Sequence, residues 1–238
     1  MRKLLLTTLV TASCFFTRLH SQLSAGISGG YTNNEFYTNI SNYDYSYYKK
    51  EGGFVVAAPV RYGITNWFAV QAEPGFIQKS FSLWQTQQTA EPTHLTNRFN
   101  FLQLPVKAHF SFGSHKWNGF LHLGGYGSYW LSGRIKGTVA DNYNSPYYPP
   151  VILFLTQNVN GKYEFDKRRD RRLQYGWLAG IGLQYAIIKK LDLFAEGRYI
   201  EDLTDQQKKH MRNQIPRYNI TTSVSAGCLY RFSMKKHT

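Results

Sequence analysis

Eight stretches of this chain alternate apolar and polar residues with a period of two, the pattern of a strand whose two faces differ. Residues 218–232 show it most clearly, because nearly every even position is apolar and nearly every odd position is small or polar. One face suits hydrocarbon and the other suits a polar interior. The pattern therefore predicts an all-β fold, an eight-stranded antiparallel up-and-down transmembrane β-barrel with its apolar residues facing lipid.

The segments between these stretches alternate between long and short. Short turns near residues 63–66, 113–116 and 187–190 would share one side of the membrane with both chain ends, and four longer loops would lie opposite. This is the topology of outer-membrane barrels, with periplasmic turns and extracellular loops. Mean hydropathy is negative, which argues against a helical membrane protein but not against a barrel, since only alternate residues of a barrel face lipid.

Residues 1–21 have the features of a secretory signal peptide, because Arg2 and Lys3 precede an apolar run that is too short to span a bilayer. We expect export through the Sec pathway, cleavage before Gln22 and a mature barrel domain of residues 22–238. Loss of three basic residues lowers the net charge from +14 to +11. For an exported basic chain, this charge favours outer-membrane lipid and lipopolysaccharide as partners rather than nucleic acid.

Charged side chains occupy eight positions on the predicted inward faces, where they would be costly without partners. We expect them to form a network of ion pairs that closes the lumen, because eight strands enclose little more than their own side chains. A conductive or gated path is the alternative. The predicted network comprises Arg61, Glu73, Lys79, Lys107, Asp192, Glu196, Arg198 and Arg231, and Arg134 is also expected to face inward.

Three prolines fall within the predicted strands. Proline cannot donate a hydrogen bond to a strand ladder and is usually found at edges or bulges. Because a closed barrel has no free edge, we expect a bulge or a kink at Pro59, Pro74 and Pro105.

Several stretches resemble the PorT-type outer-membrane β-barrel family of Bacteroidetes, which is related in architecture to the eight-stranded OmpA- and OmpX-like barrels. They are FLQLPVK at 101–107, GGYGSY at 124–129, YGWLAGIG at 175–182, and AEGRY at 195–199 followed by DLT at 202–204. The resemblance covers the mature chain and implies a surface barrel with no catalytic residues to carry over. The third loop, residues 136–171, is longer than the hairpins of the simplest members.

His109 and Ser111 lie two residues apart on one predicted strand, as do the catalytic His and Ser of a lipid A deacylase with this barrel size. That chemistry needs the pair to face lipid, where the acyl chain lies, whereas the alternation turns both residues inward. We therefore expect no enzyme. We expect no cofactor, and His94, His115 and His122 lack the spacing of metal ligands.

The long loops carry two features that suit binding. Tyrosine buries a large area at low entropic cost, so the loop tyrosines are a candidate contact surface for a protein partner, although they could instead form an aromatic belt or stack on one another. A basic run offers hydrogen bonds to lipopolysaccharide phosphates, with a solvated charge run as the alternative. The tyrosines are Tyr43, Tyr45, Tyr47, Tyr48, Tyr147 and Tyr148, and the basic residues are Lys167, Arg168, Arg169, Arg171 and Arg172.

Together these features predict a non-enzymatic, monomeric integral outer-membrane protein with a surface or structural role. Its extracellular loops would bind lipopolysaccharide or a protein partner. The alternatives are a small gated porin, a transport or secretion accessory barrel, a lipid A-modifying enzyme, and a soluble lipocalin-like binder, whose strands would face the opposite way.

Overall fold

The structure, a computed structural model, describes residues 22–38, 46–85, 93–113, 116–144, 152–209, 214 and 216–232. The predicted signal peptide lies outside these ranges, so its cleavage stays a prediction. No helix of the described chain is both long and apolar enough to cross a membrane. The strands are β1 (Gln22–Thr38), β2 (Ser46–Ala57), β3 (Val60–Gly63), β4 (Phe68–Ala72), β5 (Gly75–Gln85), β6 (Thr93–Gly113), β7 (Trp117–Asn144), β8 (Ile152–Lys162), β9 (Leu173–Ile188), β10 (Leu191–Asp202) and β11 (Arg217–Phe232).

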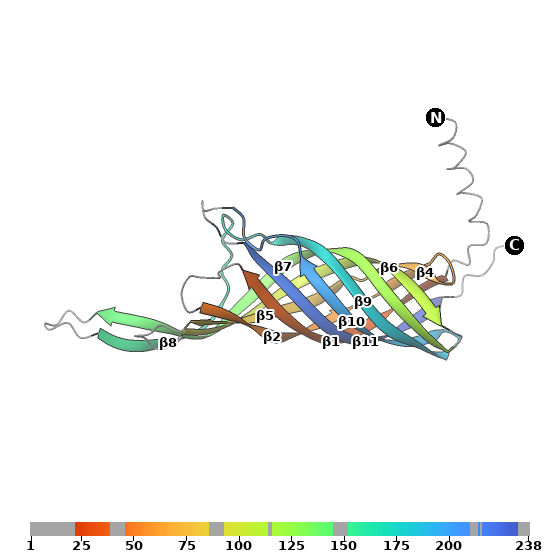
Figure 1. Ribbon diagram of the computed structural model, residues 1–238, viewed down its shortest axis with the longest axis horizontal. Coiled ribbons are helices and arrows are strands. Elements are labelled where there is room, and N and C mark those ends of the chain that lie inside the picture. The colour runs from red at the N-terminus through yellow and green to blue at the C-terminus, as the bar shows by residue number, and fades with distance from the viewer. Residues whose placement is uncertain are drawn as a thin grey trace, which may run out of the picture.

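These strands form one antiparallel sheet that closes on itself (Figure 1). β1 pairs with β11 on one side and with β2 and β3 on the other, so the first and last strands join. β2 and β3 follow one another as a single barrel strand, as do β4 and β5, and β8 lies outside the ring. The predicted eight-stranded antiparallel barrel is therefore confirmed.

Apolar side chains cover the outside of the barrel and polar side chains line its interior. Ile27 and Val224 each expose 68% of their surface, whereas the inward-facing Gln71 and Thr221 are fully buried. This facing suits lipid outside and a polar lumen inside. It is opposite to the facing that a lipocalin-like binder requires.

Three short turns join the strands at the end of the barrel where β1 begins and β11 ends, which we call the turn end; the opposite end is the loop end (Figure 1). In the turn between β3 and β4, the Phe68 amide donates to Thr65 Oγ1 at 3.0 Å. Gly113 ends β6 with φ of +135°, and a Cβ there would lie 2.6 Å from the Trp117 carbonyl oxygen. This turn therefore requires glycine.

The three strand prolines each use their carbonyl oxygen in the ladder. Pro59, Pro74 and Pro105 accept hydrogen bonds of 2.9 to 3.0 Å from the amides of Gly26, Ala58 and Glu73. Pro59 and Pro74 lie at the breaks between β2 and β3 and between β4 and β5, as expected. The bulge expected at Pro105 is absent, because the register of β6 with β7 is continuous there. The missing N–H of Pro105 instead faces the break between β4 and β5.

One bulge occurs at a position where no residue type predicts it. Asn100 pairs with Ser132 and Phe101 pairs with Trp130, so Leu131 is an extra residue in β7. Beyond this point the side chains of β7 change face. The expectation that Arg134 faces inward is therefore wrong, and its side chain is exposed.

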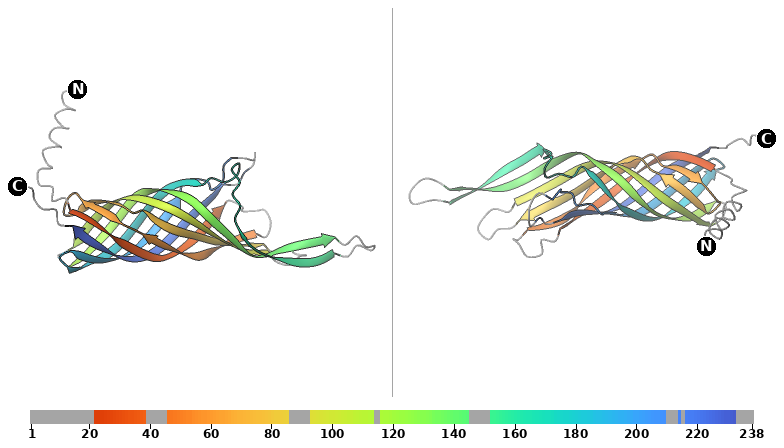
Figure 2. Two further views of the ribbon diagram at one scale, coloured as in Figure 1. Left: turned by 180° about the vertical axis from the view of Figure 1, so that it is seen from behind. Right: turned by 90° about the horizontal axis from the view of Figure 1, so that it is seen from above.

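The third long connection is a β-hairpin rather than the loop expected over residues 136–171. β7 continues to Asn144 and pairs with β8, and the hairpin extends beyond the rest of the barrel at the loop end (Figures 1 and 2). A membrane-spanning strand needs about 9–11 residues. β7 has 28 and β6 has 21, so both strands continue well beyond any bilayer.

A ring of hydrogen-bonded strands without edges resists unfolding by detergent. We therefore expect protein in mild detergent to migrate faster on a denaturing gel when it is unheated than after boiling. Identical migration of both samples, together with solubility in plain buffer, would contradict insertion into a membrane.

Candidate functional site

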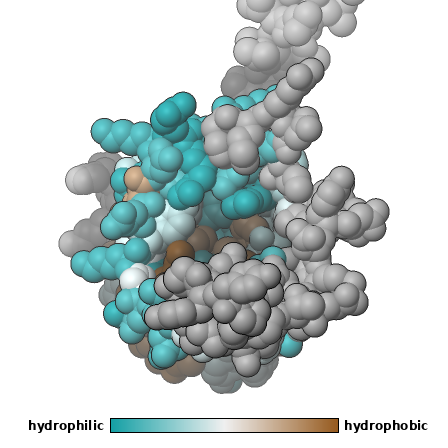
Figure 3. Space-filling view, turned by 90° about the vertical axis from the view of Figure 1, so that its left-hand side faces the viewer, coloured by the Kyte–Doolittle hydropathy of each residue, from teal (hydrophilic) through white to brown (hydrophobic). Residues whose placement is uncertain are grey.

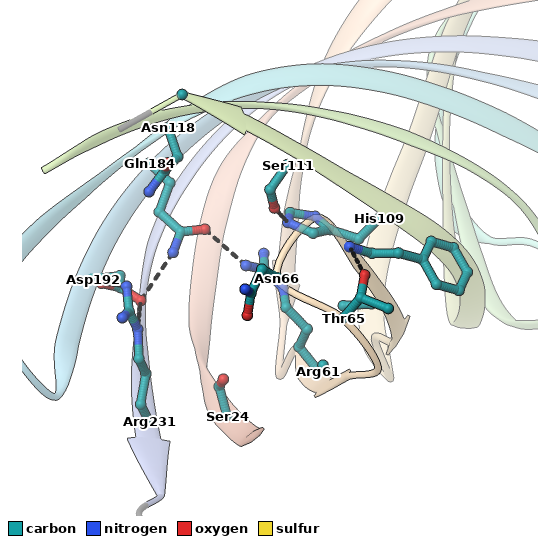
Figure 4. A pocket seen from close by; sticks show the side chains of 14 residues that line it. Ser24, Arg61, Thr65, Asn66, His109, Ser111, Asn118, Gln184, Asp192 and Arg231 are labelled. Atoms are coloured by element: carbon teal, nitrogen blue, oxygen red, sulfur yellow. Dashed lines mark hydrogen bonds and ion pairs between the residues drawn. The ribbon is translucent and has the colours of Figure 1, made fainter. Parts of the chain in front are cut away.

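The turn end of the lumen holds a polar cavity of about 700 Å³ (Figure 4). Ser24, Arg61, Ser111 and Arg231 line it together with residues of the turns. Arg61 donates from Nη1 to Gln184 at 2.7 Å and from Nε to Gln71 at 2.8 Å. The cavity wall is therefore built from side chains of β1, β3, β6, β9 and β11, and Arg61 links it to β4 and β9.

Asp192, on β10, connects this wall to Arg231 on β11. Its carboxylate accepts from Nε and Nη2 of Arg231, a bidentate pair, and from Gln184 Nε2 at 2.9 Å. Gln71 Nε2 donates to Glu73 Oε2 at 3.1 Å, which extends the connection deeper into the lumen. The amide side chains of Gln184 and Gln71 thus link Asp192, through Arg61, to Glu73.

Next along the barrel axis lies a cluster of four buried charges. Lys107 Nζ is 2.6 Å from Glu73 Oε2 and 3.6 Å from Glu196 Oε1. Arg198 lies 2.7 Å from both carboxylates, through Nη2 to Glu73 and through Nε to Glu196. The side chains of this cluster are at most 5% exposed. Each ion has two partners of opposite charge, which offsets the cost of taking it out of water.

A chain of hydrogen bonds runs from this cluster back to the cavity. Glu196 Oε1 lies 2.7 Å from His122 Nδ1, His122 Nε2 lies 2.5 Å from His109 Nδ1, and His109 Nε2 lies 2.8 Å from Ser111 Oγ. A carboxylate only accepts, so His122 donates to Glu196 and accepts from His109, and His109 accepts from Ser111. Both imidazoles can thus be neutral with every nitrogen satisfied.

Lys79 stands apart from the other seven predicted lumen charges. Its Nζ lies 2.5 Å from Asp202 Oδ1, and both side chains are almost fully buried. Tyr126 also donates to Asp202, and Asn219 donates to its other oxygen at 3.0 Å. Asn34 then donates to Asn219 at 3.1 Å, so this second polar layer reaches from β5 through β10 and β11 to β1.

Aromatic side chains fill the lumen on the loop side of the second layer. Phe36 stacks on Phe81 with ring centroids 4.2 Å apart, and Phe99 lies 4.5 Å from Trp130. Phe101 contacts Trp130 and is fully buried. This layer completes the filling of the barrel, with the turn-end cavity on one side and the loop end on the other.

Two return segments, residues 163–172 and 203–209, cross the loop end, and we call them the lid. An isolated β-bridge between Asp170 and Gln207 joins them, and the Arg171 amide donates to the Gln206 carbonyl at 3.0 Å. Phe165 packs edge-on against Trp130 of the aromatic layer. The lid is thereby fixed to the barrel interior.

The predicted basic run lies within the lid, where its members differ in role. Arg169 Nε pairs with the buried Asp170 at 2.9 Å. Arg172 donates to the carbonyls of Trp130 and Leu131, next to the β7 bulge, and stacks over Phe165 at 4.3 Å. These two arginines have internal partners. Arg171 is partly buried, and Lys167 and Arg168 are exposed.

Only two of the predicted contact tyrosines lie among the described residues. Tyr47 is 46% exposed and stacks against Trp84, with Lys49 over both rings. Tyr48 turns inward and packs against Phe36 and Phe81. The remaining ones, Tyr43, Tyr45, Tyr147 and Tyr148, fall outside the described ranges.

No cluster of three or more His, Cys, Asp or Glu side chains in the described part of the chain could hold a metal ion. Asp202, Tyr126 and the contact between His109 and His122 are not among the predicted site residues. Asp202 lies an even number of residues from Asp192, Glu196 and Arg198, so extending the alternation of β10 predicts that it faces inward. The histidine pair needed the β6–β7 register, in which these two residues are opposite.

A protein-family model described as "Outer membrane protein beta-barrel domain" matches residues 16–207. No curated protein has a sequence that matches this chain. Similar solved structures include Neisserial surface protein A (12% identity, TM-score 0.45, covering 88% of this chain and 97% of that one). Another is OprG from Pseudomonas aeruginosa (6% identity, TM-score 0.48, covering 90% of this chain and 98% of that one). The outer membrane protease OmpT from Escherichia coli is also similar (12% identity, TM-score 0.46, covering 90% of this chain and 99% of that one).

The family match spans most of the chain and agrees with the closed ring, its outward apolar face and its polar lumen. At such low identities, the solved structures say nothing about function. The chain belongs to the outer membrane protein β-barrel domain family and is an integral barrel of the outer membrane.

Proposed function

We propose that this protein is a non-conducting, non-enzymatic surface barrel that binds lipopolysaccharide phosphates at its extracellular end. The observation that carries the proposal is the filled lumen, in which two polar layers and one aromatic layer lie in series. We also propose that the protein is a monomer and that residues 1–21 are removed on export. The resemblance to PorT-type barrels of Bacteroidetes supports a surface role, and no secretion role is included.

The buried charge layers support the absence of conduction. A permeating ion would have to separate Lys107 from Glu73, or Lys79 from Asp202, in a region with little room for water. Breaking a buried pair by removing one partner typically costs about 3–5 kcal/mol, because the other charge is left uncompensated. These pairs therefore favour a structural role over a gated pore.

The charges near Ser111 argue against catalysis, although its bond to His109 resembles that of a nucleophile to its base. A general base must accept a proton, and His109 would do so close to Arg61 on the cavity wall and to Lys107, two residues earlier on the same face. Coulomb repulsion from these two cations opposes protonation of His109. The hydrogen-bonded chain is better suited to fixing the two histidines in place.

The exposed side chains of Lys167 and Arg168 support the binding site for phosphates. Arg169 and Arg172 hold the lid in place, which leaves these two exposed cations at the extracellular end free of such internal partners. Arg168 offers a planar, bidentate donor that matches phosphate oxygens.

For conduction, we expect purified protein in planar bilayers to give no stable current steps. The control is Lys189→Gln, in the exposed turn between β9 and β10. The proposal is overturned if the native protein gives current steps whose size changes in Lys107→Gln but not in Lys189→Gln. Such a result would show that ions pass through the lumen.

For lipopolysaccharide, Lys167→Gln with Arg168→Gln should weaken binding by about tenfold, the effect of losing two exposed ionic contacts, and the loss should shrink as salt is raised. Binding can be measured by titration of lipopolysaccharide into detergent-solubilised protein. Lys189→Gln with Lys190→Gln removes the same charge at the periplasmic end and should leave affinity unchanged. Equal affinities of all three proteins would reject the proposed contact.

For catalysis, a fluorophosphonate probe, which phosphonylates activated serines with loss of fluoride, should leave the folded barrel unlabelled. Intact mass spectrometry of the treated protein measures this directly. A single adduct that is absent from Ser111→Ala would show that Ser111 is activated, and the non-enzymatic assignment would then be wrong.

A further inference from the structure

A second cavity, of about 210 Å³, lies between the aromatic layer and the lid. Six aromatic rings contribute to its walls, and at the loop end hydrophobic residues are visible among hydrophilic ones (Figure 3). Water occupies about 30 Å³ per molecule in the liquid, so the space would hold a ligand about as large as one six-membered ring. The rings are those of Phe36, Tyr48, Phe81, Phe99, Trp130 and Tyr163.

The polar part of this cavity has hydrogen-bond donors without acceptors. Gln206 is 4% exposed, yet its Nε2 has no hydrogen-bond partner. Its backbone is fixed, because its amide donates to the Arg217 carbonyl at 2.9 Å and its carbonyl accepts from Arg171. The Arg217 guanidinium also lines the cavity, and among the described residues it makes no ion pair. An unsatisfied buried donor is costly, so these groups favour a ligand with acceptors.

The acidic residue in the cavity wall is already fully engaged. Asp170 accepts from Tyr163 and Arg169 at 2.9 Å on one oxygen, and from the Asp166 amide at 2.8 Å on the other. Burial, together with the bond to Asp170, raises the pKa of the Tyr163 hydroxyl to about 12, so it stays protonated and keeps donating at neutral pH. Asp170 therefore braces the wall, and the buried group there that lacks a partner, Gln206 Nε2, is a donor.

We propose that this cavity binds the ring of an acidic sugar, a uronic acid unit of a surface saccharide. The C–H faces of such a ring suit aromatic walls, its hydroxyl oxygens can accept from Gln206, and its carboxylate can pair with Arg217. A hydrocarbon chain or a plain aromatic ring would fill the same walls but leave both donors unpaired. The site is separate from Lys167 and Arg168, so it goes beyond the phosphate binding proposed above.

The test uses full-length protein in detergent, with glucuronic acid as the probe and glucose as the neutral analogue. Saturation-transfer NMR should show saturable binding of glucuronic acid, and glucose should bind at least about tenfold more weakly because it lacks the charge. Trp130 lies in the wall, so its fluorescence offers a second readout.

Three variants distinguish this site from other sources of binding. Arg217→Gln should weaken glucuronic acid binding by about tenfold, through loss of a charge-assisted hydrogen bond, and Gln206→Ala by about fivefold. Lys167→Gln with Arg168→Gln should leave it unchanged, which separates this inference from the phosphate proposal. Heat-dependent gel migration confirms that each variant is folded.

The outcomes that overturn the inference are equally specific. It fails if glucuronic acid shows no saturable signal, if glucose binds as tightly, or if folded Gln206→Ala and Arg217→Gln both bind like the native protein. Loss of binding only in the Lys167 and Arg168 variant would move the sugar to the outer surface and also reject the cavity.

Discussion

Every backbone N–H and C=O group inside a bilayer must find its partner within the protein, since lipid offers none. In this chain the requirement is met by the pairing of β1 with β11, which closes the sheet. Three prolines can lie in this closed wall, because each contributes its carbonyl to the ladder and lies where a donor is not needed. Leu131, the extra residue in β7, has a carbonyl that accepts from Arg172 of the lid.

Closing eight strands leaves a narrow lumen, so the second constraint is the cost of burying charge. Glu73, Lys107, Glu196 and Arg198 solve it by giving each ion two opposite partners, and Lys79 solves it with Asp202. The same groups that satisfy one another also block the axis. The interior therefore stabilises the barrel, and the exposed cations and the second cavity lie at the loop end.

The fold was predictable because alternation in β9, β10 and β11 directly reports which side of the sheet touches lipid. Strand ends were less predictable. Apolar alternation stops where the membrane stops, but backbone pairing in β1 and β7 continues further at the loop end because a neighbouring strand is still available. The inserted residue at Leu131 inverted the expected facing of Arg134, and a bulge of this kind leaves no mark in composition.

The sequence by itself determined the eight strands of the barrel, the facing of these strands up to the bulge in β7 and the inward position of the eight lumen charges, since all of these follow from a period of two residues along one chain. Only the tertiary structure decided which charges meet, that Arg169 and Arg172 fasten the lid while Lys167 and Arg168 stay exposed, and that Gln206 and Arg217 share a cavity. Such contacts depend on register and closure between segments far apart in sequence, and a local periodicity carries no information about distance across a barrel.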